Sequence, residues 1–412
     1  MSEDKGKMIL SKLKQLEIHR YTNYIIMAYA FILPLSRAGI SFFTALLILI
    51  WLLEGNFKYK LHVLKTNKVI WALGIFLLFN LLSVFWTDDR AETLHYIHKY
   101  WYFLPIVVLC TSLKKEQISK ALSAFILGMF VSEIIAYGVF FELWQFKHAT
   151  PENPSPFMHH IEYSVFLAFT ALVLLSRIFN EKQMKYKGIY LLFFSTISGN
   201  LFLTEGRTGQ LAFIIGLFIL TIVSFTNKTK AIVVAMTLSF ILLIIAFNFS
   251  HTFHDRMFMT QESIAHIVEE KDYCSSLGGR VGACIVAKDI IINHPIIGEG
   301  ITDNMKRFHH LIDTKYPEME CMQENFMHMH NQYLQIFTEL GLIGLLIFLN
   351  IFYRVARIKI KNREYEQIKY IYVSVLLFAF LSEVIFHRQF SMALFAFIVG
   401  LLLAQNRVEN EI

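Results

Sequence analysis

The chain has 412 residues, of which 55% are hydrophobic and 15% aromatic, and its mean hydropathy is +0.49. Soluble globular domains are markedly more polar, so the composition excludes an ordinary soluble enzyme and indicates a membrane protein. The net charge of +6 does not indicate a nucleic-acid partner, because the basic residues are scattered among short connections and form no basic, aromatic-rich groove.

Apolar runs close to the roughly 20 residues that a helix needs to cross a bilayer recur along the whole chain. They predict an all-α polytopic membrane protein with about twelve transmembrane helices. The predicted spans are 22–36, 39–54, 69–86, 100–112, 119–141, 161–178, 188–205, 208–226, 231–249, 333–353, 370–386 and 389–405. We therefore expect residues 1–412 to form a single membrane domain.

The orientation follows from lysine and arginine, which are retained in cytoplasmic connections. Placing both termini in the cytoplasm puts the basic connections on the inner side, and this alternation holds at every connection. The basic start of the chain is followed by an apolar segment without a small-residue cleavage site, so we expect the first helix to remain in the mature protein. The inner connections that carry these charges lie at 58–68, 114–120, 177–187, 228–230 and 354–369.

One long outer loop, residues 250–332, interrupts the apolar pattern. Within it, small and apolar residues from 278 onward predict a helix that ends at Pro295 and the glycines after it. The loop also contains Cys274, Cys284 and Cys321. An outer location permits a disulfide, but no pairing can be read from three candidates.

Three arginines are placed where membrane burial does not explain them. Arg207 lies in a short outer hairpin, "EGRTG", Arg280 should lie in the first turn of the loop helix, and Arg388 should lie in a tight turn between the last two helices. An arginine at a helix end can simply extend to the interface, or be an exposed loop charge. However, the inner side is rich in lysine and the outer turns carry arginine, whose fork binds phosphate oxygens in a bidentate way.

His330 stands directly before Asn331 at the start of a predicted membrane helix. Imidazole is a suitable general base for a sugar hydroxyl near neutral pH, yet a His and Asn pair at a helix start can equally be a cap for free backbone N–H groups. The other loop histidines lack the spacing of a metal motif. We therefore expect neither a metal nor another cofactor.

The segment "HNQYLQIFTELGLIGLLIFL", from His330 through Glu339, Gly341 and Gly344, resembles the signature of the O-antigen ligase and polymerase superfamily. "GRVGACIVAKDIIINHPIIGEG" is similar to the arginine-led loop helix of that family, and "EGRTG" to its arginine hairpin. These motifs lie within residues 158–405, and the order of the helices extends the resemblance over the whole chain.

The resemblance implies a metal-independent, inverting glycosyltransferase of the GT-C type in the inner membrane of a Gram-negative bacterium. It would move O-antigen from undecaprenyl diphosphate to a lipid A-core sugar at the periplasmic face, among inner-membrane lipids. His330 would be the base, with Arg207 and Arg280 on the diphosphate. Further candidates for binding the donor or acceptor are Arg388, Asn331, Tyr333, His387, Arg37 and His160.

Three alternatives use the same sequence features differently. An O-antigen polymerase often has glycine eleven residues after each outer arginine, but Phe218 and Ile291 occupy these positions here. A protein O-oligosaccharyltransferase would share the donor and differ in the acceptor. A non-enzymatic transporter should show paired mid-membrane charges and repeated halves with broken helices, and the sequence shows neither.

Overall fold

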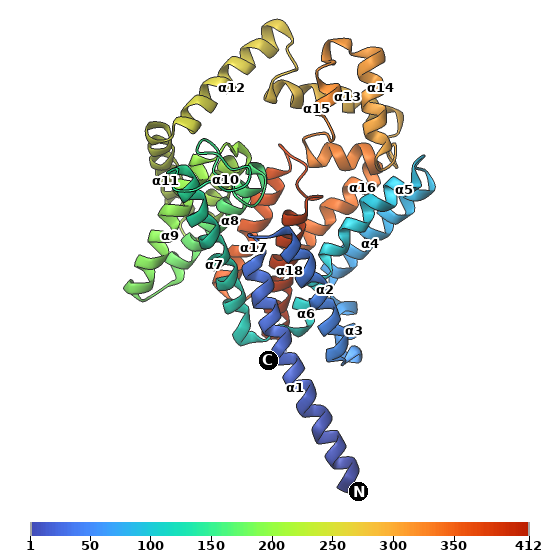
Figure 1. The fold of residues 1–412 in the computed structure, drawn as a ribbon, viewed down its shortest axis with the longest axis vertical. Coiled ribbons are helices and arrows are strands. Elements are labelled where there is room, and N and C mark those ends of the chain that lie inside the picture. The colour runs from blue at the N-terminus through green and yellow to red at the C-terminus, as the bar shows by residue number, and fades with distance from the viewer. Residues whose placement is uncertain (1, 411–412) are drawn as a thin grey trace.

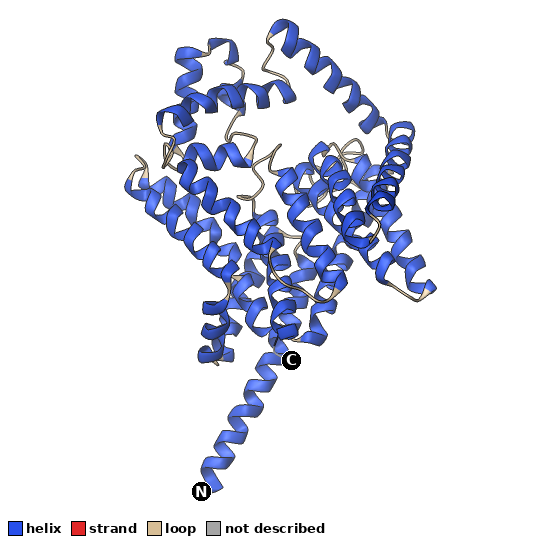
Figure 2. Cartoon of the chain, turned by 180° about the vertical axis from the view of Figure 1, so that it is seen from behind, coloured by secondary structure: helices blue, strands red, loops and turns tan. Residues whose placement is uncertain are grey.

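The computed structural model describes residues 2–410, with side chains described from residue 17 onward except that of residue 325. Within this range the fold consists of helices joined by loops, without any β-strand (Figures 1 and 2). The first half of the chain contains α1 (Ser2–Ile32), α2 (Arg37–Glu54), α3 (Phe57–Thr66), α4 (Lys68–Leu82), η1 (Ser83–Phe85), α5 (Arg90–His98), η2 (Lys99–Phe103), α6 (Pro105–Ser112), α7 (Lys115–Phe140), α8 (His160–Asn180) and α9 (Met184–Leu203). The second half contains α10 (Arg207–Ser224), α11 (Lys228–Phe249), α12 (His251–Glu270), α13 (Ser276–Asn293), α14 (Asp303–Lys315), η3 (Pro317–Met319), α15 (Met322–Asn325), α16 (Gln332–Ala356), α17 (Arg363–Ala379) and α18 (Gln389–Asn410).

The chain is an all-α polytopic membrane protein, as the composition predicts. In the part of the chain that the structure describes, eight helices are long and apolar enough to cross a membrane. They are α2, the continuous α4–η1 segment, α7, α8, α10, α11, α16 and α18, and each matches a predicted span. The other four predicted spans fall on α1, η2–α6, α9 and α17.

Two of the predicted spans are wrong in part. Residues 100–112 do not form one helix, because the chain changes from η2 to α6 at Pro105, and the eight residues of α6 are too short to cross a bilayer. The span 370–386 ends early, since α17 stops at Ala379 and residues 380–388 form a loop. Val384, Ile385 and Phe386 of this loop are buried as helix residues would be, so hydropathy alone does not distinguish the two.

The helices α8 and α18 form the centre of the bundle, and most of their residues are buried. α8 packs against α9, α10 and α17, while α18 packs against α6 and η2. In contrast, α2 and α11 lie at the periphery, where few of their residues are buried. Apolar side chains on peripheral helices are what a bilayer requires of its contact surface.

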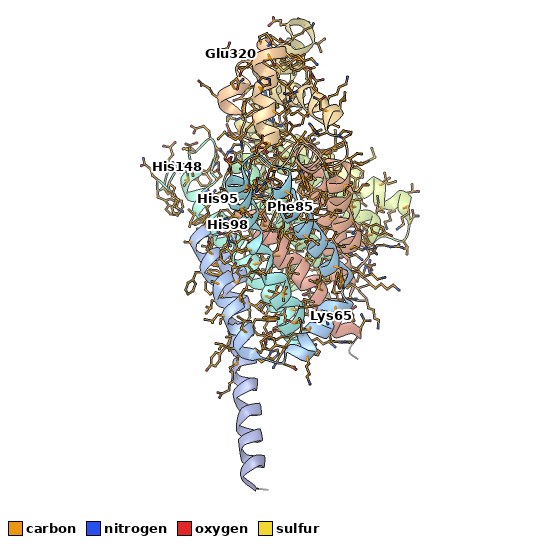
Figure 3. All side chains as sticks on the ribbon, turned by 90° about the vertical axis from the view of Figure 1, so that its right-hand side faces the viewer. Lys65, Phe85, His95, His98, His148 and Glu320 are labelled. Carbon is orange, nitrogen blue, oxygen red and sulfur yellow. A yellow bond between two sulfur atoms is a disulfide. The ribbon has the colours of Figure 1, made fainter. Side chains whose placement is uncertain are left out.

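The two ends of the bundle differ. Both termini and the basic α3, with Lys65, lie at one end, which we call the lower face (Figures 1 and 3). Helices α12 to α15 lie at the opposite end, the upper face, where Glu320 is found (Figures 1 and 3). The helices α13 to α15 enclose a small core of their own, and a disulfide joins Cys274 to Cys321.

The helix α16 is broken at Gly341, whose φ is +66°. The connection between α13 and α14 fills this break: the N–H of Leu342 donates to the carbonyl of Pro295 at 2.9 Å, and that of Ile343 to Ile296 at 3.2 Å. A Cβ at Gly341 would lie 2.3 Å from the carbonyl carbon of Ile296. The glycine is therefore required for conformation and for space.

The same connection is held from its other side. The N–H of Glu299 donates to Thr338 at 2.9 Å, and that of Gly300 donates to Glu339 at 3.0 Å. Gly298, at φ +76°, lies so close to α16 that a Cβ would be 2.4 Å from the carbonyl carbon of Glu339. Gly298 and Gly341 thus let the connection after α13 and the backbone of α16 approach each other closely. We call this contact the interlock, and it gives these motif positions a structural role.

Gly341→Ala tests this interlock. We expect the variant to lose about 2 kcal/mol or more of folding stability, because alanine is strained at positive φ and its methyl displaces the backbone of residues 295–296. The apparent Tm of the purified protein in detergent measures the loss. Gly188→Ala is the matched control, since nothing lies within 4 Å of a Cβ there; equal Tm values for the two variants would contradict the interlock.

Candidate functional site

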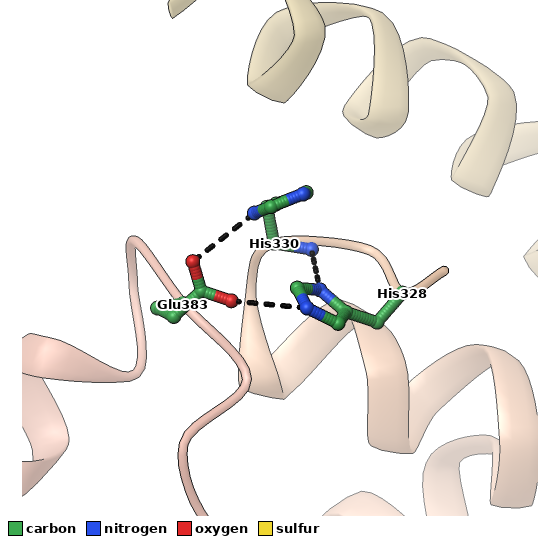
Figure 4. Close-up of side chains that lie close together, drawn as sticks. All are labelled: His328, His330 and Glu383. Carbon is green, nitrogen blue, oxygen red and sulfur yellow. Dashed lines mark hydrogen bonds and ion pairs between the residues drawn. The ribbon is translucent and has the colours of Figure 1, made fainter. Parts of the chain in front are cut away.

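A buried carboxylate in the loop of residues 380–388 is the centre of the site. Glu383 is fully buried, and its Oε2 lies 3.1 Å from Nδ1 of His330 (Figure 4). Its Oε1 lies 3.4 Å from Nε2 of His328 and 3.4 Å from Nη2 of Arg388. One carboxylate therefore brings together two histidines from the segment before α16 and an arginine from the segment before α18.

Backbone hydrogen bonds fix the start of α16 against this loop. The N–H of Gln332 donates to the carbonyl of Phe380 at 2.8 Å, and Nδ2 of Asn331 donates to Leu381 at 2.9 Å. The N–H of Phe386 donates back to Oε1 of Gln332 at 2.9 Å. The loop is therefore held on both sides of Glu383, although it is not helical.

The two functions considered for the His330 and Asn331 pair are divided between the residues. Oδ1 of Asn331 accepts from the N–H groups of Tyr333 and Leu334, so Asn331 is the cap of α16. His330 has a left-handed backbone, at φ +47°, which turns its ring toward Glu383. Since a carboxylate only accepts, Nδ1 of His330 carries the proton in this contact, and Nε2 is the ring nitrogen that can offer a lone pair.

The electrostatics of the cluster favour a charged carboxylate. Burial alone would raise the pKa of Glu383, but its interactions with His330, His328 and Arg388 outweigh burial and lower the pKa to about 2. Burial lowers the pKa of His328 to about 4, although Glu383 favours its charged form. His328 is therefore a neutral neighbour near pH 7, and Arg388 is the permanent positive partner.

Ser382, the residue before Glu383, joins two more of the predicted segments to this loop. Nε of Arg280 donates to the carbonyl of Ser382 at 3.0 Å. The hydroxyl of Ser382 lies 2.8 Å from that of Thr208, which directly follows Arg207. Arg280 is the fifth residue of α13, not in its first turn as expected, and burial lowers its pKa.

Arg207 is held by α12. Its Nη1 donates to the hydroxyl of Thr260 at 2.7 Å, and one turn earlier Arg256 forms an ion pair with Glu205. Arg207 lies within electrostatic range of both Arg256 and Arg280. The guanidinium groups of Arg256 and Arg280 thus act on that of Arg207, and of the three Arg280 contacts the 380–388 loop.

Close packing positions the hairpin of residues 204–206 that carries this arginine. A Cβ at Gly209 would lie 2.2 Å from the backbone of Ser164 in α8, and one at Gly206 would lie 2.2 Å from the Ser164 side chain. The N–H of Gly209 also donates to the hydroxyl of Ser164 at 3.1 Å. The glycines of "EGRTG" therefore allow the start of α10 to pack closely against α8.

Arg37 and His160 lie near the cluster without a direct contact to Glu383. The Arg37 guanidinium lies 5.7 Å from the ring centre of Phe390, and its charge acts on His159 together with that of Arg388. His160 packs against His159 and lies within electrostatic range of Arg256 and Glu383. These residues border the cluster on the side of α2 and α8.

The other predicted binding residues have packing partners of their own. The hydroxyl of Tyr333 donates to the carbonyl of Leu377 at 2.6 Å. His387 stacks on Tyr96, with ring centroids 3.5 Å apart. Their part in substrate binding stays a prediction, as it does for Asn331, whose side chain caps α16. Arg388 was expected in a tight turn but ends a nine-residue loop.

Sequence reasoning missed Glu383, His328 and Arg256. The signal for Glu383 was present, because an acidic residue inside an apolar run is costly and usually has a partner. A helical continuation before His330 would point His328, two positions earlier, in another direction, and this expectation from the sequence is wrong: the left-handed turn at His330 lets both rings face Glu383. Arg256 had no local signal, since its partner Glu205 lies on another helix connection.

His328, His330 and Glu383 are also the described residues that most resemble metal ligands, with one ligand atom of each lying within 4.8 Å of the others. Arg388, however, lies on the same atoms: its Nη2 is 3.4 Å from Oε1 of Glu383 and 3.5 Å from Nε2 of His328. The guanidinium of Arg388 therefore already brings to these donor atoms the positive charge that a bound cation would bring.

Comparison with known proteins supports the resemblance. Residues 191–349 match the family model described as O-antigen ligase. Over this segment the chain is similar to O-antigen ligases. Members of that family are glycosyltransferase-like enzymes that act on lipid-linked sugars. The matched segment contains Arg207, Arg256, Arg280 and His330 and ends before Glu383.

A protein of Haemophilus influenzae (strain ATCC 51907 / DSM 11121 / KW20 / Rd), described as an uncharacterized protein, is 25% identical to the chain over 319 residues. The aligned region covers 73% of this chain and 75% of the relative. The similarity therefore extends well beyond the matched family segment into the other membrane helices.

The depressed pKa of His328 predicts a pH-dependent stability. Between about pH 6.5 and 4 an unfolded His328 binds a proton that the folded one does not, so stability falls as the pH falls, by up to about 1.4 kcal/mol per pH unit. His328→Gln keeps a polar side chain and removes this titration. We expect the Tm of the wild type to fall more steeply than that of the variant over this range; parallel Tm curves would contradict the assignment.

Proposed function

We propose that the protein transfers a glycan from a lipid-linked diphosphate to a sugar hydroxyl at the upper face, with inversion and without a metal. The observation that carries the proposal is the arrangement around Glu383: His330 and Arg388 contact its carboxylate, and Arg280 of α13 donates to the carbonyl of the neighbouring Ser382. Acid–base and phosphate-binding groups of this kind, together at one end of a membrane bundle, fit a reaction on a membrane-anchored diphosphate.

The arginines would bind the leaving group. In this proposal Arg207 and Arg280 contact the diphosphate, with Arg256 adding positive charge. As the bond between the anomeric carbon and the diphosphate oxygen breaks, negative charge builds on that oxygen. Guanidinium groups that are already held in place, as by Thr260 and Ser382, stabilise this state more than the ground state.

His330 would activate the acceptor. Its Nε2 takes the proton of the sugar hydroxyl while the hydroxyl oxygen attacks the anomeric carbon from the side opposite the diphosphate. The ring then carries a positive charge, which the carboxylate of Glu383 stabilises through Nδ1. Glu383 also holds the tautomer that leaves the lone pair on the reacting nitrogen.

The orientation and the substrates complete the proposal. With the basic lower face in the cytoplasm, the upper face lies in the periplasm of a Gram-negative inner membrane, and both termini are cytoplasmic. The donor would be O-antigen on undecaprenyl diphosphate and the acceptor the lipid A core, which makes the protein an O-antigen ligase in lipopolysaccharide biosynthesis. The second candidates, a polymerase or a protein O-oligosaccharyltransferase, use the same donor and the same base.

Deletion of the gene and gel analysis of lipopolysaccharide separate these activities. A ligase predicts loss of the long ladder and accumulation of lipid-linked polymer. A core that carries a single repeat unit would instead indicate a polymerase. A normal ladder with an unglycosylated pilin would indicate the protein-directed enzyme, and an unchanged phenotype in every assay would contradict the proposal.

Variants distinguish the effect of the proposed base from that of the proposed phosphate-binding arginines. We expect His330→Ala to reduce transfer by about 10² to 10⁴ while donor binding stays near that of the wild type. Arg280→Lys should weaken both donor binding and turnover, because a point charge does not replace a bidentate fork. Complementation of the deletion strain and binding of labelled donor to the purified variants measure the two effects. Full activity of His330→Ala would exclude the mechanism.

A further inference from the structure

We infer that Phe326 is a positioning residue, and that the disulfide between Cys274 and Cys321 makes this positioning depend on oxidation. The ring of Phe326 stands between α13, which carries Arg280, and the imidazole of His330. The side chain of Phe326 thereby sets the position of His330, the proposed base, relative to α13 and Arg280, the proposed diphosphate ligand. The inference rests on the proposed function, because it assigns these two residues their roles.

The contacts of the ring leave it little freedom. A methyl group on Gly279 would lie 2.4 Å from Cζ of Phe326, so α13 has no room for a side chain at this position. On the other side, the ring meets His330 edge-on, with centroids 4.7 Å apart and planes at 67°. Phe308, fully buried in the core of α13 to α15, stacks parallel to it at 6.1 Å.

The disulfide fixes the segment that carries Phe326. Cys274 precedes α13 by two residues and Cys321 directly precedes α15, a helix of four residues. A helix this short has little stability of its own. Besides the disulfide, it is held against α13 by Met322, whose sulfur would lie 2.8 Å from a Cβ at Gly282. The disulfide closes a loop across 47 positions and clamps both segments together.

These contacts close a ring of interactions around the site. Arg280 is fixed to Ser382, and His330 is fixed to the neighbouring Glu383. Phe326 connects the other sides of the same two elements, because it touches both Gly279 and His330. Displacing the Phe326 side chain therefore changes the distance between Arg280 and His330, and a misplacement of about 1 Å can reduce a rate by roughly 10²-fold.

Gly279→Ala tests the positioning role. The added methyl pushes the Phe326 ring, so we expect kcat of reconstituted transfer to fall at least about tenfold while the KM for the donor changes by less than about threefold. Phe326→Leu, which is smaller, should restore much of kcat in the Gly279→Ala background. Gly74→Ala, where a Cβ meets nothing within 4 Å, is the control. Unchanged kcat in Gly279→Ala, or no rescue by Phe326→Leu, would overturn the inference.

Reduction tests the disulfide. Wild-type protein treated with dithiothreitol should lose kcat and keep donor binding, and re-oxidation should restore it. The Cys274→Ser/Cys321→Ser variant should have the lowered kcat from the start and be insensitive to reductant, with Cys284 still present as a control thiol. Equal kcat for oxidised and reduced wild type would refute the redox dependence. Failure of the proposed function is distinguishable, because it would show as absent transfer by the oxidised wild type.

Discussion

A carboxylate buried among membrane helices determines how the upper face is built. An unpaired charge in such a place is costly, so Glu383 requires partners that satisfy both of its oxygens. His330, His328 and Arg388 provide them. Because these partners come from the segments before α16 and before α18, pairing the carboxylate joins two chain segments separated by more than 50 residues. The same pairing fixes the tautomer of His330 and so links the fold to the proposed chemistry.

The second constraint is the broken helix α16. The break at Gly341 frees backbone N–H groups that the connection after α13 satisfies through Pro295 and Ile296. α13 is therefore attached at both ends, at Arg280 to the 380–388 loop and at its C-terminal side to α16. The superfamily motifs thus divide into two kinds of residues. Their glycines hold backbone segments against each other, while their arginines and His330 are the residues that we propose for binding and catalysis.

Much of this arrangement is predictable from the sequence, and the parts that are not have physical reasons. Hydropathy identifies the long helices, and the small and apolar residues from 278 onward identify the helix of Arg280. Hydropathy cannot find the end of α17, because Ile385 and Phe386 are buried in a loop as deeply as they would be in a helix. For the same reason Glu383 was hidden inside a predicted span. The pairing of Cys274 with Cys321 and that of Arg256 with Glu205 depend on contacts between distant segments, which one sequence does not reveal.

The central claim is that His330 and Glu383 act as one unit, and a double-mutant cycle on the transfer rate tests it most directly. Wild type, His330→Ala, Glu383→Gln and the double variant are compared in proteoliposomes with lipid-linked donor and lipid A-core acceptor. If Glu383 acts through His330, removing it from the His330→Ala variant costs little further activity, and the two losses are strongly non-additive. If the losses multiply as independent effects, the carboxylate does not act through the histidine and the account is contradicted.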